Sequence, residues 1–178
     1  MAPDTGRVLL PAQRNPHIML RVVLVFKHEP DYRQHTFLTP EADMAVIGIG
    51  LDLVERARIE RALNRFDEAF LARILSAEER RRVPQGAARR VDFVAARFAA
   101  KEAAAKALGT GFANGIGPRD FEILSLPSGA PHLRLSGAAL EQAKRLDVST
   151  CHLTLTHSTT HAAAVVILET ASLTSSRI

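Results

Sequence analysis

From residue 44 onward, hydrophobic positions follow two spacings that separate strands from helices. Apolar runs, or alternation of apolar and polar residues, are typical of strands, whereas apolar residues three and four apart mark one helix face. These patterns predict strands at 45–50, 121–126, 132–135, 152–157 and 162–168. They predict helices at 55–66 with a continuation to 75, just after residue 76, at 87–108 and at 137–146.

Local signals mark where several of these elements begin and end. Ser76 is followed three residues later by Glu79, which is the pattern of a capping box at a helix start. Ser136 is the expected cap of the helix at 137–146. An alanine-rich stretch runs into Gly109 and Gly111, and glycine commonly stands just past a helix C-terminus. We therefore expect the long helix to stop at this glycine pair.

The chain divides into three parts by composition. Its 178 residues suit one domain with a sizeable core. Residues 1–43 differ from the rest because prolines and histidines concentrate there. We predict a poorly ordered extension at 1–43, one domain at 44–170 and a frayed tail at 171–178.

Two carboxylates interrupt stretches that are otherwise apolar or alanine-rich. Asp52 follows the first strand, and its burial without a partner would be costly, so it needs a cation, a helix-capping role or solvent. Glu102 and Lys106 are four apart and share a helix face. With Lys101, they suit a site for a hard cation and phosphate, because magnesium takes one or two carboxylates, waters and phosphate oxygens. An ordinary surface ion pair and a helix cap are the alternative interpretation.

His157 ends an alternating strand and is the third candidate for chemistry. It suits a general acid or base, a phosphate donor, or a structural histidine held by hydrogen bonds. The sequence has no G-x-S-x-G elbow of a serine hydrolase and no Walker sequence. The glycines at 109–117 do not form a dinucleotide fingerprint, because that motif opens a helix and these glycines close one.

Composition and charge limit the kinds of binding partner and the cellular location that we expect. The net charge of +4 suits an acidic partner, either a nucleic acid, a phosphorylated ligand or an acidic protein. Aromatic residues make up only 5%, and no nucleic-acid recognition motif is present, so nucleic acid is disfavoured. The single cysteine, Cys151, cannot form an internal disulfide, which fits a reducing, cytoplasmic location. The apolar run Ile18–Phe26 is too short to span a membrane.

Four stretches together resemble the holo-[acyl-carrier-protein] synthases, which are bacterial-type 4'-phosphopantetheinyl transferases. They read GIGLDLV at 48–54, RFAAKEAAAKALGTG at 97–111, GAP at 129–131 and LTLTHS at 153–158. The resemblance runs from residue 44 to about residue 169, with the motifs in the order of that family. The sequence departs from it at His161, where many members have tyrosine, and in the LTLTH strand motif, where serine often replaces one threonine.

The resemblance implies an activity and a set of site residues. The 4'-phosphopantetheine arm of coenzyme A would move to a serine of apo acyl carrier protein, in fatty acid biosynthesis, leaving adenosine 3',5'-bisphosphate. Asp52 and Glu102 would hold Mg²⁺, Lys106 would contact the phosphate under attack, and Glu102 is the candidate to accept the serine proton. The remaining family positions would help to hold coenzyme A: Arg97, Lys101, Gly109, Pro131 and His157.

The resemblance also implies a fold and an assembly. The fold would be α+β, with an antiparallel sheet packed around the long helix, and short members form homotrimers with active sites at subunit interfaces. An acidic carrier protein would suit the arginines of the first helix, Arg56, Arg58, Arg61 and Arg65. A carrier from a polyketide or peptide synthase, a small basic nucleic-acid-binding protein, and a non-catalytic partner of a transferase are the alternatives.

Overall fold

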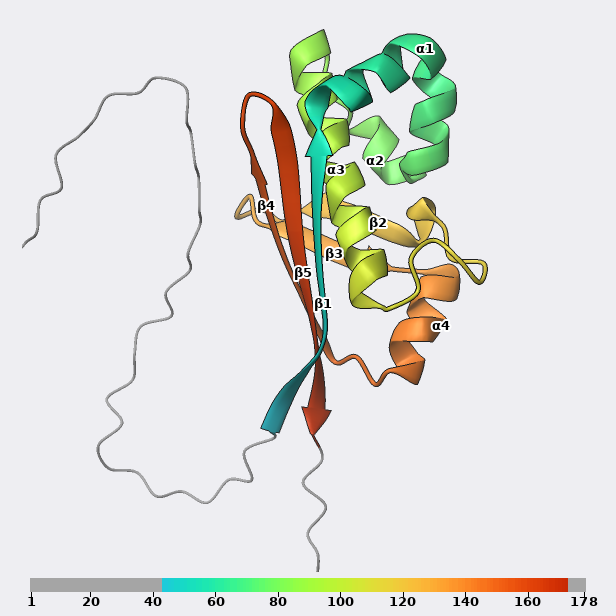
Figure 1. The fold of residues 1–178 in the computed structure, drawn as a ribbon, viewed down its shortest axis with the longest axis vertical. Helices are drawn as coiled ribbons and strands as arrows, with labels where there is room; N and C mark the ends of the chain where they lie inside the picture. The colour runs from blue at the N-terminus through green and yellow to red at the C-terminus, as the bar shows by residue number, and fades with distance from the viewer. Residues whose placement is uncertain (1–42, 173–178) are drawn as a thin grey trace, which may run out of the picture.

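The computed structural model describes residues 43–172, in which helices and strands are interspersed along the chain (Figure 1). The predictions for residues 1–42 and 173–178 lie outside the described residues. The element order is β1 (Asp43–Glu55), α1 (Arg56–Ile74), α2 (Ala77–Arg81), α3 (Ala87–Ala107), the 3-10 turn η1 (Pro118–Asp120), β2 (Phe121–Ser125), β3 (Pro131–Leu135), α4 (Gly137–Arg145), β4 (Thr150–His157) and β5 (His161–Ser172).

The strands form two antiparallel sheets that both contact α3. One sheet has three strands in the order β1-β5-β4, and the other is the hairpin of β2 and β3. The long helix α3 lies along the three-stranded sheet, and α1 and α2 lie on the side of α3 that faces away from this sheet (Figure 1). This confirms the predicted α+β fold with antiparallel strands packed around one long helix.

Two glycines of β1 let the backbone of α3 come unusually close to the sheet. A β-carbon added at Gly50 would overlap the carbonyl oxygen of Ala103, and one added at Gly48 would overlap that of Ala107. Ala103 and Ala107 are themselves buried and add only a methyl group each. The glycines of β1 and the alanines of α3 therefore set how far apart the two backbones lie, and with it which side chains of β1 can reach those of α3.

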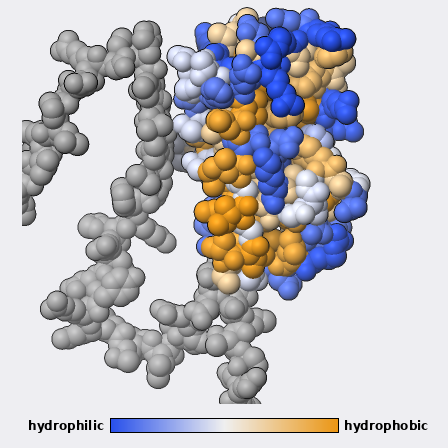
Figure 2. Space-filling view, viewed as in Figure 1, coloured by the Kyte–Doolittle hydropathy of each residue, from blue (hydrophilic) through white to orange (hydrophobic). Residues whose placement is uncertain are grey.

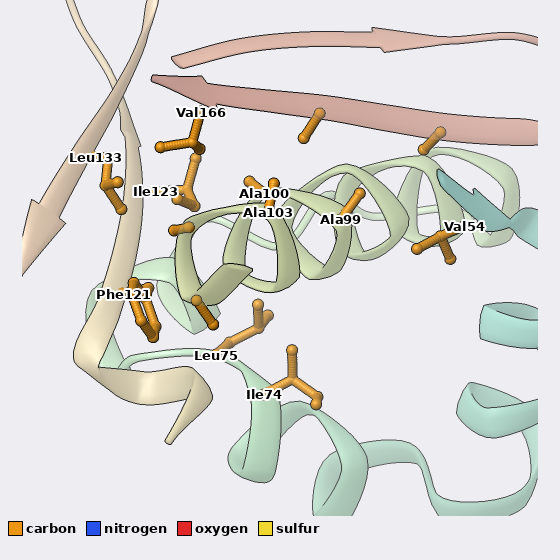
Figure 3. Packing of buried hydrophobic residues seen from close by; sticks show 14 of the residues in the cluster. Val54, Ile74, Leu75, Ala99, Ala100, Ala103, Phe121, Ile123, Leu133 and Val166 are labelled. Atoms are coloured by element: carbon orange, nitrogen blue, oxygen red, sulfur yellow. The ribbon is translucent and has the colours of Figure 1, made fainter. Parts of the chain in front are cut away.

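The core surrounds α3 on three sides. Its alanines contact apolar side chains from both sheets and from the end of α1. Figure 3 shows Ile123 and Val166 beside the C-terminal half of the helix, with Ile74 and Leu75 on the side away from β5. Leu75, Ile123 and Val166 are each at most 1% exposed. The alanines of α3 are small and the apolar side chains around them are larger, so the helix packs closely against its neighbours, as the alanine-rich sequence predicts.

The element boundaries agree with the sequence patterns in most places. The capping box of α2 is present, because the Ser76 hydroxyl accepts from Glu79 N at 3.2 Å and the Glu79 carboxylate accepts from Ser76 N at 2.8 Å. Past the end of α3, Gly109 and Gly111 have φ of 73° and 57°, in the left-handed region that favours glycine, so the predicted helix stop is confirmed. Ser136 precedes α4, but its hydroxyl makes no capping bond.

Other boundaries differ from the predictions. Asp52 does not cap a helix, because β1 continues through Glu55 and α1 begins only at Arg56. β5 continues to Ser172, which is two residues into the predicted tail. The helix at 55–75 is broken at Asp67, whose φ of 36° and ψ of −113° are not helical. The continuous apolar spacing on both sides of Asp67 hid this kink.

The sheet face that points away from α3 carries a row of exposed apolar side chains. Figure 2 shows apolar residues gathered on the side of the molecule where β1 and β5 lie in Figure 1. The exposed members from β1 are Val46, Ile47, Ile49, Leu51 and Leu53, between 40% and 66% exposed. We call this row the outer apolar face. Contiguous apolar surface of this kind usually marks a contact site.

Candidate active site

Asp52 and Lys106 form an ion pair where β1 crosses α3. Lys106 Nζ lies 2.7 Å from Asp52 Oδ1 and donates a second hydrogen bond, 3.1 Å long, to the Leu51 carbonyl. The Asp52 side chain is 14% exposed and the Lys106 side chain 50% exposed, so the pair lies at a rim open to solvent. Asp52 lies on the same strand face as Gly50, since side chains two apart in a strand share a face. The close glycine contact therefore brings its carboxylate to the helix.

Glu102 adds a second carboxylate to this pair. It lies one helical turn before Lys106 on the same face of α3, half-buried. Burial raises the pKa of Glu102, and the charge of Asp52 raises it further, while Lys106 and Arg58 oppose the rise. A half-buried carboxylate beside a second carboxylate forms a site that a further cation would stabilise.

The donor set fits magnesium better than a softer metal. Both candidate ligands are carboxylates, which suit a hard cation that keeps several waters and phosphate oxygens in its shell. Among residues 43–172, no group of three or more His, Cys, Asp or Glu side chains gathers as a metal cluster would require. The geometry therefore suits a cation held partly by substrate, and not a fully protein-enclosed metal.

Arg58 belongs to this charge cluster, although no sequence pattern separates it from the other arginines of α1. Its guanidinium lies 5.6 Å from the centroid of the Phe98 ring, and it acts on Glu102 electrostatically. Phe98 is one turn before Glu102 on α3. Arg58 therefore lies beside the carboxylates and is also exposed on α1. Among four arginines of one helix, spacing alone could not distinguish it.

Lys101 lies in the interior, away from the site. Its ammonium donates to Glu79 Oε2 at 2.6 Å, to the Ile74 carbonyl at 2.9 Å and to the Pro118 carbonyl at 3.1 Å. Burial lowers the pKa of Lys101, and the charge of Glu79 opposes that change. All three ammonium donors are used and the side chain is 1% exposed, so none is left for a phosphate. We therefore correct the sequence-based assignment and leave Lys101 out of the coenzyme site.

Arg97 lies one turn before Lys101, on a different face of α3 from Glu102. Its guanidinium stacks 3.3 Å from the centroid of the Phe93 ring and donates to the Phe93 carbonyl at 3.3 Å. Its Nε is buried without a hydrogen-bond partner among the described residues. Burial lowers the pKa of Arg97 to about 10. The side chain remains half-buried and can still offer donors to an anion.

The other three predicted coenzyme residues lie at separate places on the surface. Gly109 is exposed just past the end of α3, and Pro131 begins β3. His157 is the last residue of β4 and is exposed. The sheet register pairs His157 with Ala162, which pairs in turn with Val54 of β1. Within one chain the structure thus brings together Asp52, Glu102 and Lys106, but not the five coenzyme residues.

Comparison with known proteins gives this fold and site a family. Residues 48–166 match the model of the 4'-phosphopantetheinyl transferase superfamily, so the chain belongs to that family. It is 48% identical over 124 residues to the holo-[acyl-carrier-protein] synthase of Desulfovibrio desulfuricans, covering 70% of this chain and 98% of that one.

Two solved structures of such synthases are also similar. The structure from Neisseria meningitidis has a TM-score of 0.64 and 35% identity, covering 70% of this chain and 98% of that one. The structure from Bacillus anthracis, in complex with CoA (3',5'-ADP), has a TM-score of 0.60 and 37% identity, covering 72% and 99%. These similarities confirm the family that the four sequence stretches indicated.

Proposed function

We propose that this chain is a holo-[acyl-carrier-protein] synthase. It transfers the 4'-phosphopantetheine group of coenzyme A to a serine of apo acyl carrier protein, in fatty acid biosynthesis. The observation that carries the proposal is the cluster of Asp52, Glu102 and Lys106 on a chain of the phosphopantetheinyl transferase family. The proposal is further supported by relatives that are named synthases and by one that binds coenzyme A.

Asp52 and Glu102 would hold Mg²⁺ in this reaction. The ion, when bound, supplies positive charge against the negative phosphate oxygens of coenzyme A. Lys106 pairs with Asp52 in the free chain, and its long side chain is half-exposed. It can therefore turn from Asp52 to a phosphate oxygen and stabilise the charge that develops as the phosphoryl group transfers.

The chemistry itself needs a proton acceptor and no nucleophile from this chain. The serine oxygen of the carrier forms a bond to the phosphorus that bears pantetheine. The bond from that phosphorus to the bridging oxygen breaks, and adenosine 3',5'-bisphosphate leaves with the electron pair. Glu102, directly or through a water, is the candidate to accept the serine proton.

Coenzyme A would be held by residues around the cluster: Arg97, Gly109, Pro131 and His157. They come from four separate places in the chain, α3, the loop after it, β3 and β4, and such a scattered set favours a site completed by another subunit. The outer apolar face supplies the surface for such an assembly, and we propose a homotrimer with interfacial active sites. Sedimentation equilibrium tests this, since a mass of three chains supports the trimer and a monomer contradicts it.

The carrier protein would dock on α1. Arg58, Arg61 and Arg65 are exposed there, and their positive charge suits an acidic carrier. Arg56 is not available for this role, because its side chain is engaged within the chain. No helix among the described residues has the length and apolar character to cross a membrane. A cytoplasmic location stays a prediction from the single cysteine.

The test is the mass of apo acyl carrier protein after incubation with this chain, coenzyme A and magnesium. We expect the carrier to gain one phosphopantetheine, and the gain to disappear when a chelator is added. A carrier whose serine is replaced by alanine is the matched control. Carriers from fatty acid, polyketide and peptide synthases are tried in parallel to find the preferred class. No gain with any carrier would contradict the proposed activity.

A further inference from the structure

The turn between β4 and β5 follows His157 directly and is exposed along its length. Within the turn, Ser158 N donates to the His161 carbonyl at 2.8 Å, and the Ser158 hydroxyl accepts from Thr160 N at 3.2 Å and from His161 N at 3.1 Å. These bonds shape the turn but do not hold it to the helices. The sheet register places His157 beside Ala162, and any direct attachment of the turn at 158–160 to the helices must come from a further contact.

Arg56 supplies those contacts. As the first residue of α1, it donates its backbone N–H to the Thr160 carbonyl at 2.8 Å. Its side chain reaches back to the same turn, where Nη1 donates to the Thr159 carbonyl at 2.6 Å. Figure 1 shows the β4–β5 turn at the same end of the molecule as the start of α1. One residue thus holds the turn through both its backbone and its side chain.

A second side-chain nitrogen of Arg56 extends the connection to α3. Its Nε forms an ion pair with Asp92, and the two side chains are 24% and 33% exposed. Asp92 precedes Glu102 on the same helix by ten residues. Arg56 itself follows Asp52 by four residues at the end of β1. It therefore joins the three segments that carry Asp52, Glu102 and His157.

We infer that Arg56 is a positioning residue that sets where His157 stands relative to the carboxylate cluster. This rests on the proposed function, in which the cluster holds the reacting end of coenzyme A and His157 holds another part of it. A long substrate bound at two separated places is sensitive to their spacing. The reacting groups are untouched by Arg56, so it governs binding of coenzyme A and leaves the chemical step alone.

The experiment compares Arg56→Met, Arg56→Lys and Asp92→Asn with the unaltered chain in the carrier-mass assay. Arg56→Met keeps the aliphatic stem and the backbone bond but loses the side-chain donors. Hydrogen bonds to charged groups contribute enough that we expect KM for coenzyme A to rise about tenfold, with kcat and KM for the carrier unchanged. Asp92→Asn should raise the same KM less, and Arg56→Lys should restore part of the loss.

The matched control is Arg89→Met, which removes an exposed arginine of α3 with no side-chain bond among residues 43–172. It should leave both KM values and kcat unchanged. The inference is overturned if KM for coenzyme A stays constant in Arg56→Met, or if kcat and both KM values shift together as a general loss of structure would cause. Asp92→Asn placed on Arg56→Met should add little, because both changes break one connection.

A binding measurement distinguishes failure of the proposed function from failure of the inference about Arg56. If the unaltered chain transfers nothing to any carrier, calorimetric titration of the same variants with coenzyme A replaces the kinetics. A Kd raised about tenfold in Arg56→Met and unchanged in Arg89→Met still supports the positioning role. Equal Kd values, or no binding of coenzyme A by the unaltered chain, overturn it.

Discussion

Two neighbouring residues of α3, Lys101 and Glu102, face opposite demands. Lys101 points into the interior, where three oxygens take all of its donors. Glu102 points to the open side, where Asp52 repels it and its charge is only partly balanced. Successive helix residues are rotated by about 100°, so one turn of α3 serves two purposes. Lys101, whose donors are all bonded, stabilises the fold. Glu102, whose charge is only partly balanced, is the one that we propose for the reaction.

The largest effect on activity should come from a substitution on the open side of α3, at Glu102. Glu102→Gln removes one candidate metal ligand and the candidate base while it keeps the side-chain shape. We expect transfer to the carrier to fall by about a thousandfold, within the range that general bases contribute. The melting temperature should not fall, because burial and the charge of Asp52 disfavour the Glu102 charge that the substitution removes. A variant that transfers at the normal rate would show that Glu102 has neither role.

A substitution on the interior side of α3 should lower stability and leave the rate of transfer unchanged. Lys101→Met leaves Glu79 buried without its cation, and such a loss costs about 3–5 kcal/mol of unfolding free energy. Urea denaturation measures this against the unaltered chain. At temperatures where the variant is still folded, kcat should remain close to normal, since Lys101 has no donor for the substrate.

A double variant sharpens that measurement. Replacing Glu79 as well, by Gln, removes the uncompensated charge and should recover part of the lost stability, since a neutral amide is cheaper to bury than a carboxylate. A Lys101→Met chain as stable as the original would contradict the view that this ion pair supports the fold. A kcat reduced while stability is retained would return Lys101 to the site.

The smallest effect concerns pH. Because burial and Asp52 raise the pKa of Glu102, the folded chain binds a proton there more tightly than the unfolded chain does. Ionised Glu102 therefore lowers stability above the ordinary glutamate pKa of about 4.3. In the presence of a chelator, Glu102→Gln should be the more stable chain at pH 7, and the advantage should vanish near pH 4. An advantage that does not change with pH would rule out this electrostatic cause.

The sequence predicted what depends on local patterns. Periodicity and the glycine stop located α3, and the family resemblance of four short stretches predicted that Asp52 and Glu102 share a site; in the structure the two carboxylates are close enough for Asp52 to act on Glu102. It could not reveal the partner of Lys101, because Glu79 already had a local explanation as the third residue of a capping box. The contacts of Arg56 were hidden for a similar reason. Asp92 and Thr159 are 36 and 103 residues away, and no local rule connects positions at such separations.

The kink at Asp67 illustrates a different limit. Apolar residues continue at helical spacing through 66–75, so the pattern alone predicts one uninterrupted helix. In the structure, Arg90 of α3 holds the kink from outside, with Nη2 2.6 Å from Asp67 Oδ1 and 3.2 Å from Glu68 Oε1. Tertiary contacts of this kind override the local preference for a straight helix.

The position of β1 has a consequence for how the chain survives in a cell. In the described part of the chain it is an edge strand of 13 residues, and its outward side chains are apolar. Long apolar edges are templates for pairing with other chains, and this one carries no proline. A newly made chain is therefore at risk of aggregation while that strand stays uncovered. If the proposed trimer covers it, the yield on expression should depend on how quickly the chains assemble, and slower synthesis at low temperature should favour the assembled protein.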